Sequence, residues 1–215
     1  MGMTTRTYGI LDRIIGEIDK AIKVLASPAR PRRASPDPAG GELDLNDAER
    51  WESIRLMRVN HSGEIAAQAL YRGQALTARN DAVAAAMRRA ASEEMDHLAW
   101  CEERLRELRG RTSLLNPLWY AGSLAIGALA GAVGDRASLG FVAETEKQVE
   151  VHLRGSKDRL PAADRRSRAI VERMTHDEVA HGAQAASLGA DELPFPLRSA
   201  MRLTSRVMTK SSYWL

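Results

Sequence analysis

Apolar residues recur every three or four positions along most of the chain, which is the spacing of a helical face rather than of a strand. The pattern predicts an all-α protein whose longest helices cover about 47–78, 81–108, 137–158 and 163–188. Asn46 or Asp47 is suited to cap the first of these helices, and Gly110 to end the second. Pro194 and Pro196 mark the start of a last helix.

The N-terminal part has a different pattern. Residues 10–25 place an isoleucine-rich face opposite a charged face, which predicts an amphipathic helix in a segment 1–26. Residues 27–42 contain four prolines and indicate a flexible linker, followed by one domain over 43–215. Acidic residues interrupt the first helix and exclude a secretory signal. The helix is then either a docking arm or a membrane-surface element.

One stretch, 118–134, is apolar and uncharged. It is shorter than the roughly 20 residues that a bilayer-spanning helix needs. Its many glycines and alanines favour a tightly packed core helix, or one that lies at a membrane surface, over a membrane span.

Composition supports the helical interpretation. A chain of 215 residues suits one domain, and 5% aromatic against 44% apolar residues favours helices over sheets. The single cysteine, Cys101, excludes an internal disulfide framework, and we expect it to be a small buried residue.

The basic excess is confined to the C-terminal tail, where no acidic residue follows Glu192 and four basic residues recur every four positions: Arg198, Arg202, Arg206 and Lys210. Without these four, the 31 Lys and Arg fall to 27, against 28 Asp and Glu. The main body therefore lacks the basic clusters that nucleic-acid binding requires. The four residues form one ridge of a helix beside an apolar surface, which favours contact with an anionic membrane over a merely solvated ridge.

The candidate chemistry lies in a unit that occurs twice, a Glu-x-x-His motif with a lone Glu about thirty residues before it. Glu and His three positions apart lie on one side of a helix. Two antiparallel helix pairs facing each other bring four carboxylates and two imidazoles together inside a four-helix bundle, which is the ligand set of a di-iron or di-manganese site. Four buried carboxylates without cations would repel one another strongly. The six candidate ligands are Glu64, Glu94, His97, Glu146, Glu178 and His181.

Other polar residues near the motifs are candidates to support the ligands by hydrogen bonds. Glu93 and Asp177 each stand four residues before a motif His, so they support that imidazole or compete as ligands, and Asp96 is the alternative support in the first motif. For His61 and His152 we favour hydrogen-bonding or surface roles over ligation. Tyr71 either lines the cavity or packs in the core.

The run Arg58-Val59-Asn60-His61-Ser62-Gly63-Glu64, with Gln68-Ala69-Leu70-Tyr71 after it, resembles the signature of the demethoxyubiquinone hydroxylases of ubiquinone biosynthesis. Asn116-Pro117-Leu118-Trp119, both Glu-x-x-His motifs and Glu146 with His152 agree with it. The resemblance covers about residues 43–215, and the N-terminal helix and proline-rich segment resemble the longer bacterial form.

This resemblance implies a ferritin-like, membrane-associated di-iron monooxygenase that uses O2 to add one hydroxyl to the ring of a polyprenylated methoxy-methyl-benzoquinone. Glu64, Glu94 and His97 would serve one iron, and Glu146, Glu178 and His181 the other, with Glu94 and Glu178 bridging the two. It also implies a peripheral protein on the cytoplasmic face of the bacterial cell membrane, in a homo-oligomer or a complex of ubiquinone biosynthesis.

Two other classes of function compete with this one. A ferroxidase or iron-storage bundle, or less favourably a di-manganese catalase, would share the metal site but take no organic substrate. A non-enzymatic membrane-surface scaffold would leave the Glu and His residues solvated. Metal content separates the scaffold from the enzymes, and quinone hydroxylation separates the monooxygenase from the ferroxidase.

Overall fold

The computed structural model describes residues 10–36 and 44–215, with side chains described from Gly16 onward in the first helix. All regular structure in these ranges is helical, and the predicted helix limits differ from the observed ones by one or two residues. The helices are α1 (Ile10–Ala26), α2 (Asp47–Thr77), α3 (Asp81–Glu107), α4 (Asn116–Val133), α5 (Asp135–Arg159), α6 (Arg165–Ser187) and α7 (Phe195–Trp214).

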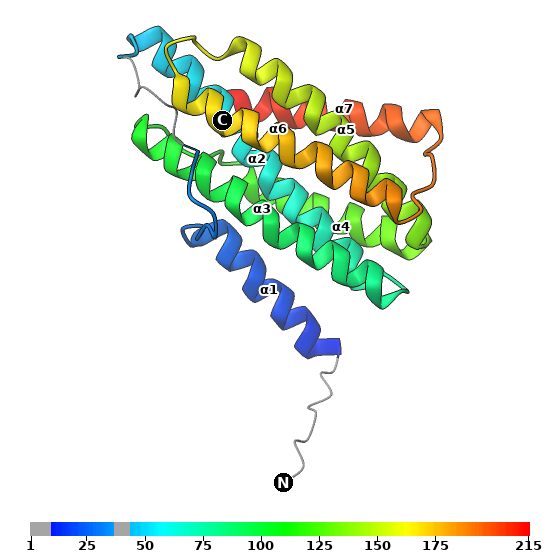
Figure 1. Ribbon diagram of the computed structural model, residues 1–215. Coiled ribbons are helices and arrows are strands. Elements are labelled where there is room, and N and C mark those ends of the chain that lie inside the picture. Colours follow the sequence, from blue (N-terminus) through cyan, green and yellow to red (C-terminus); the bar gives the residue numbers. More distant parts are fainter. Residues whose placement is uncertain (1–9, 37–43) are drawn as a thin grey trace.

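Helices α2, α3, α5 and α6 form a four-helix bundle (Figure 1). The α2–α3 pair faces the α5–α6 pair, and α4 connects α3 to α5 by running along the outer side of α2. Each bundle helix contributes to one core cluster, with Ile54 from α2, Trp100 from α3, Leu153 from α5 and Ile170 from α6. Cys101 is buried in the same cluster, as predicted. The predicted all-α bundle is therefore confirmed.

Polar side chains cap three of the bundle helices. Asn46 and Glu49 form a capping box at the start of α2, because each side chain accepts a hydrogen bond from the other's backbone N–H. The Asn80 side chain accepts from Ala82 N at the start of α3. Asp164 accepts from Ser167 N at the start of α6. These caps satisfy amide groups that have no partner within the helix.

Helix α4 lies very close to α2 because glycines occupy the contact. A methyl group added at Gly73 would lie 2.2 Å from the carbonyl oxygen of Leu124, and one at Gly127 would lie 2.1 Å from that of Leu70. The stretch predicted over 118–134 is thus a tightly packed helix. None of the described helices is long and apolar enough to cross a membrane.

Helix α1 contacts the bundle along one side. Val24 is buried with Ile65 and Tyr120, whereas Ile18 and Ile22, on the predicted apolar face, are exposed. Only part of that face is covered, because the helix is turned so that Val24 points to the bundle. The predictions made for 1–9 and 37–42 lie outside the described residues.

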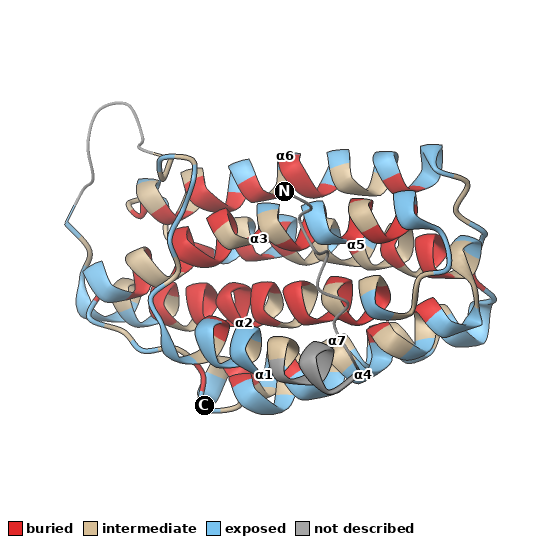
Figure 2. Ribbon diagram, turned by 90° about the horizontal axis from the view of Figure 1, so that it is seen from below, coloured by how far each residue is buried: buried red, intermediate tan, exposed pale blue. Residues whose placement is uncertain are grey.

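Helix α7 runs along the outside of the bundle and is fixed at its C-terminal end. Trp119 Nε1 on α4 donates a hydrogen bond to Ser212 Oγ at 3.1 Å, and Leu114 N donates to the carbonyl oxygen of Leu215 at 3.1 Å. Buried residues concentrate along α2, whereas α4 and α7 are largely exposed on their outer sides (Figure 2). Helix α2 therefore occupies the centre, with α4 and α7 on one side of it.

Candidate metal centre

The four bundle helices bring all six predicted ligands to one place. Helix α2 supplies Glu64 and α5 supplies Glu146, while α3 and α6 each supply one Glu-x-x-His motif. Within each of two groups, one ligand atom from every residue lies within 4.8 Å of the others. Glu94 and Glu178 belong to both groups, which is the arrangement of two adjacent metal sites that share bridging carboxylates. The groups are Glu64, Glu94, His97 and Glu178, and Glu94, Glu146, Glu178 and His181.

The donor set fits a pair of divalent cations. Burial reduces the four carboxylates to at most 3% exposure, so their charges cannot be balanced by solvent. Among the described residues, no hydrogen-bond donor reaches one buried oxygen of Glu64 and one of Glu146. Carboxylate oxygens together with imidazole nitrogens are good ligands for iron(II) and manganese(II). This burial also argues against a scaffold whose Glu and His residues are solvated.

Without metal, protons on some of the ligand residues reduce the repulsion among the four carboxylates, as the directions of the pKa shifts indicate. Burial raises the pKa of Glu64 and Glu146 well above the usual range. The charge of Glu178 adds to the rise in both pKa values, and that of Glu94 adds to the rise for Glu64. Burial opposes the charged form of His181, but hydrogen bonds with Glu178 and Glu94 raise its pKa to about 12. Binding two divalent cations would therefore release protons from these groups.

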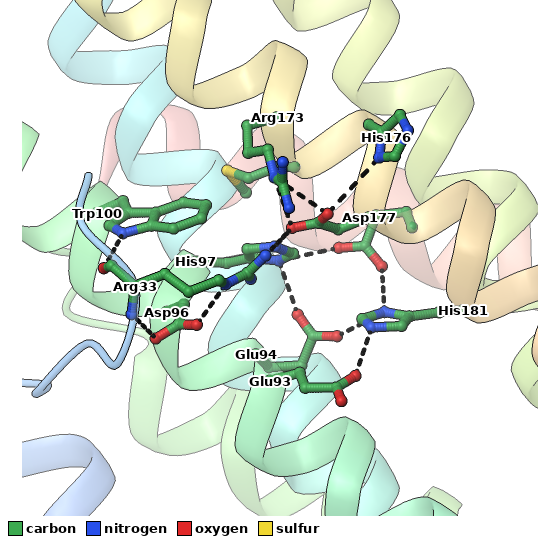
Figure 3. Close-up of polar contacts among 12 residues, drawn as sticks. Arg33, Glu93, Glu94, Asp96, His97, Trp100, Arg173, His176, Asp177 and His181 are labelled. Atoms are coloured by element: carbon green, nitrogen blue, oxygen red, sulfur yellow. Dashed lines mark hydrogen bonds and ion pairs between the residues drawn. The ribbon is translucent and has the colours of Figure 1, made fainter. Parts of the chain in front are cut away.

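The two imidazoles are supported in a crossed arrangement (Figure 3). His97 on α3 points Nδ1 toward Glu94, at 3.0 Å, and donates from Nε2 to Asp177 on α6, at 3.1 Å. His181 on α6 points Nδ1 toward Glu94, at 3.2 Å, and donates from Nε2 to Glu93 on α3, at 3.0 Å. In both rings Nδ1 is thus directed at the carboxylate cluster.

Sequence spacing identified Asp177 and Glu93 as candidate supports but placed each beside the His of its own helix. The structure shows the opposite pairing, because the residue just before each motif Glu points across to the neighbouring helix. Such carboxylates fix the orientation and tautomer of a metal-binding imidazole and raise its basicity.

The remaining candidates have different positions. Among the described residues, Asp96 accepts hydrogen bonds from Arg33 and from the backbone of Arg32 rather than from an imidazole. Tyr71 is buried and lines a small cavity together with His181, and its hydroxyl has no hydrogen-bond partner among the described residues. Tyr71 also packs in a core cluster with Met87 and Val142, so it is a core residue that lies near His181.

His61 and His152 take part in hydrogen bonds away from the ligand groups. Asn116 Nδ2 lies 3.3 Å from His61 Nδ1, which connects α4 to α2. His152 Nε2 lies 3.2 Å from Asn60 Oδ1, which connects α5 to α2. Burial lowers the pKa of both histidines to about 4, so both are neutral near pH 7.

An apolar groove of about 320 Å³ lies on the outer side of α2 and α5. Gly63 and Ala67 of α2 line it beside Glu64, and Thr145 of α5 lines it beside Glu146. Helix α4 lines the groove with Ile126, and α7 lines it with Met201 and Met208. An apolar molecule in this groove would therefore lie behind the two helices that carry the lone glutamates.

The chain is similar to one protein family and to relatives that share one name. Residues 52–212 match the sequence profile of the family described as ubiquinone biosynthesis protein COQ7. A protein of Cupriavidus pinatubonensis named 3-demethoxyubiquinol 3-hydroxylase is 58% identical over 207 residues, covering 94% of this chain and 99% of the relative. One of the same name from Chromobacterium violaceum is 55% identical over 204 residues, covering 95% and 99%.

Proposed function

Because the chain belongs to the COQ7 family of ubiquinone biosynthesis proteins, we propose that it is a monooxygenase that hydroxylates the ring of a polyprenylated demethoxyubiquinol with O2. The observation that carries this proposal is the pair of buried Glu/His groups that share Glu94 and Glu178. The names of its relatives specify the quinol, the reduced form of the ring that sequence reasoning described as a quinone.

Two iron ions are the cofactor that suits this site. Glu64, Glu94 and His97 would hold one iron, Glu146, Glu178 and His181 the other, and Glu94 and Glu178 would contact both. When bound, the iron pair supplies the electrons that activate O2 next to an organic substrate. The bundle holds the ligands in place, and its apolar core keeps water from the reaction.

The apolar groove is the proposed route for the substrate. A polyprenyl chain needs an extended apolar surface, and a ferroxidase, which takes only iron and O2, has no use for one. Gly63, which lines the groove, is adjacent in sequence to Glu64, so a ring would reach the centre by passing between α2 and α5. Replacing Thr204, which lines the groove from α7, with Trp should raise KM for long-tailed quinol. Thr209→Trp, on the same helix but outside the groove lining, is the matched control.

We also propose that the protein works as a peripheral protein at the cytoplasmic face of the cell membrane. Leu129 and Val133 of α4 and Leu203 and Val207 of α7 are exposed, and α4 and α7 flank the groove. Contact through these residues would open the groove toward lipid, where the substrate is dissolved. A homo-oligomer or a complex with other enzymes of the pathway is compatible with the same exposed surface.

The decisive experiment is hydroxylation by purified, iron-loaded protein supplied with the quinol, a reductant and isotopically labelled O2. We expect one labelled oxygen atom in the product. Glu178→Ala should abolish turnover and reduce the iron content below two per chain, because the lost carboxylate belongs to both ligand groups.

Glu172→Ala is the matched control for that variant, since Glu172 lies on the same helix but is exposed. It should retain wild-type iron content and turnover. Full iron content without labelled product in the wild type would support the ferroxidase instead. Wild-type turnover by Glu178→Ala would contradict the site assignment.

A further inference from the structure

Residues 27–36, which follow α1, are held against α3 next to the candidate metal centre. The backbone N–H of Ala29 donates to Glu102 at 2.9 Å, and that of Arg32 donates to Asp96 at 2.6 Å. Asp96 also accepts from the backbone of Arg33 at 3.3 Å. A segment whose composition indicates a linker therefore has a fixed course in this part.

The side chain of Arg33 contacts carboxylates of two helices beside the candidate metal centre, α3 and α6 (Figure 3). Its Nε donates to Asp96 of α3 at 2.6 Å, and its Nη1 donates to Asp177 of α6 at 2.7 Å. The guanidinium lies 4.9 Å from the ring centroid of Trp100, whose Nε1 donates to the Arg33 carbonyl oxygen at 3.2 Å. The planar group is thus held by two carboxylates and one aromatic face.

Asp177 connects Arg33 to the imidazole of His97. Its Oδ2 accepts from Arg33 and from His97 Nε2, and Arg173 approaches its Oδ1 at 3.2 Å. The corresponding carboxylate behind His181, Glu93, is half exposed and accepts only from His181 among the described residues. Within the described part of the N-terminal segment, contacts reach the support of His97 but not that of His181.

We propose that Arg33 is a positioning residue for the metal centre. By fixing Asp177, Arg33 keeps the hydrogen bond from His97 Nε2 to Asp177 in place. Nδ1 of the same ring then faces the carboxylate cluster. The N-terminal segment is then a structural part of one metal site rather than only a tether for α1. This inference rests on the proposed di-iron function, but its test does not require hydroxylation.

The test is a titration of metal-free protein with Co²⁺ under nitrogen, followed by optical absorption. Replacing a carboxylate that supports a metal ligand typically weakens metal binding by 10–100-fold, so Arg33→Gln should weaken one of the two Co²⁺ sites by about 10-fold. Arg33→Lys should recover part of this loss, because it retains the charge but cannot reach both carboxylates as a fork. Arg32→Gln is the matched control, since that side chain is exposed and only its backbone N–H contacts Asp96.

A double-mutant cycle separates positioning from a general effect on folding. If Arg33 acts through Asp177, then Arg33→Gln should change Co²⁺ affinity little in an Asp177→Asn background. Unchanged affinity of Arg33→Gln, or losses that simply add in the double variant, would overturn the proposal. Because metal binding is the readout, a protein that binds two Co²⁺ but never hydroxylates quinol would refute the proposed function alone.

The coupling between metal binding and docking of the N-terminal segment acts in both directions, which allows a second measurement. If the docked segment strengthens metal binding, metal must strengthen docking of the segment by the same factor. Trypsin cleavage after Arg32 or Arg33 should therefore slow by up to about 10-fold on Co²⁺ loading. A cleavage rate that does not respond to Co²⁺ would contradict the inference.

Discussion

Asp177 on α6 accepts a hydrogen bond from Nε2 of His97 on α3, and Glu93 on α3 accepts one from His181 on α6. Each helix therefore supplies one imidazole and the carboxylate that orients the other helix's imidazole. This exchange joins α3 to α6 at the centre and couples the orientation of the two rings. The two supports differ in burial, since Asp177 is nearly buried and Glu93 is half exposed.

That difference predicts unequal effects of removing the two charges. Asp177→Asn keeps a hydrogen-bond acceptor for His97 but loses the charge that Arg33 and Arg173 hold, so we expect metal affinity at one site to fall by about 10–100-fold. Glu93→Gln should lower metal affinity by a smaller factor, because solvent already screens the charge of Glu93. Co²⁺ titration of both variants measures this difference. Equal losses would show that burial of the support does not determine its effect.

The sequence predicted the six ligands because both Glu-x-x-His spacings and the lone glutamates follow from helical periodicity. It could not predict which helix each supporting carboxylate faces, since helical phase does not specify the neighbour. The role of Arg33 could not be predicted for another reason: its partners Asp96 and Asp177 lie 63 and 144 residues away in the sequence. A proline-rich segment has no helical or strand periodicity from which the direction of a side chain could be predicted.

The close contact of α2 and α4 predicts opposite effects for two glycines of α4. A Cβ on Gly127 would meet the carbonyl oxygen of Leu70 at 2.1 Å, whereas one on Gly122 meets nothing within 4 Å. Gly127→Ala should therefore lower the free energy of unfolding by about 1–3 kcal/mol. Gly122→Ala should raise it by up to about 1 kcal/mol, because alanine favours the helix. Urea unfolding followed by circular dichroism measures both. Equal stability of the two variants would contradict the observed contact.

Burial of His61 predicts a dependence of stability on pH. Ser62 donates its hydroxyl hydrogen to Asn116 Oδ1, which turns the Asn116 amide toward His61 Nδ1 as a donor. Burial lowers the pKa of His61 from 6.5 to about 4, so between these values the unfolded chain binds more protons than the folded one. The contribution to stability is complete above pH 6.5 and falls with decreasing pH, by at most about 1.4 kcal/mol per pH unit.

The measurement for His61 compares metal-free wild type with metal-free His61→Gln, in which this group cannot titrate. The metal-ligand residues are present in both proteins, so their titration cancels in the difference. We expect the wild type to lose stability relative to the variant as the pH falls from 6.5 toward 4. A pH-independent difference would show that His61 is protonated equally in the folded and unfolded states.

The last prediction concerns the basic ridge of α7, and the structure divides it into two halves. Arg198 pairs with Glu192 at 3.2 Å and Arg202 approaches Glu144 at 3.9 Å. Arg206 and Lys210 are exposed and have no ion pair within the described part of the chain. Only these two charges are fully available to an anionic lipid surface.

Each basic residue near an anionic leaflet contributes about 1 kcal/mol to membrane binding, and salt weakens this attraction. Changing all four residues to Gln should therefore release the protein from anionic vesicles at low salt, as measured by sedimentation. Arg206→Gln with Lys210→Gln should account for most of this release, and Arg198→Gln with Arg202→Gln for little. Turnover of long-tailed quinol should fall with vesicle binding, while a short-tailed soluble analogue should still be hydroxylated because the metal ligands are unchanged. If sedimentation does not change, membrane contact must come from the exposed apolar residues of α1, α4 and α7 instead.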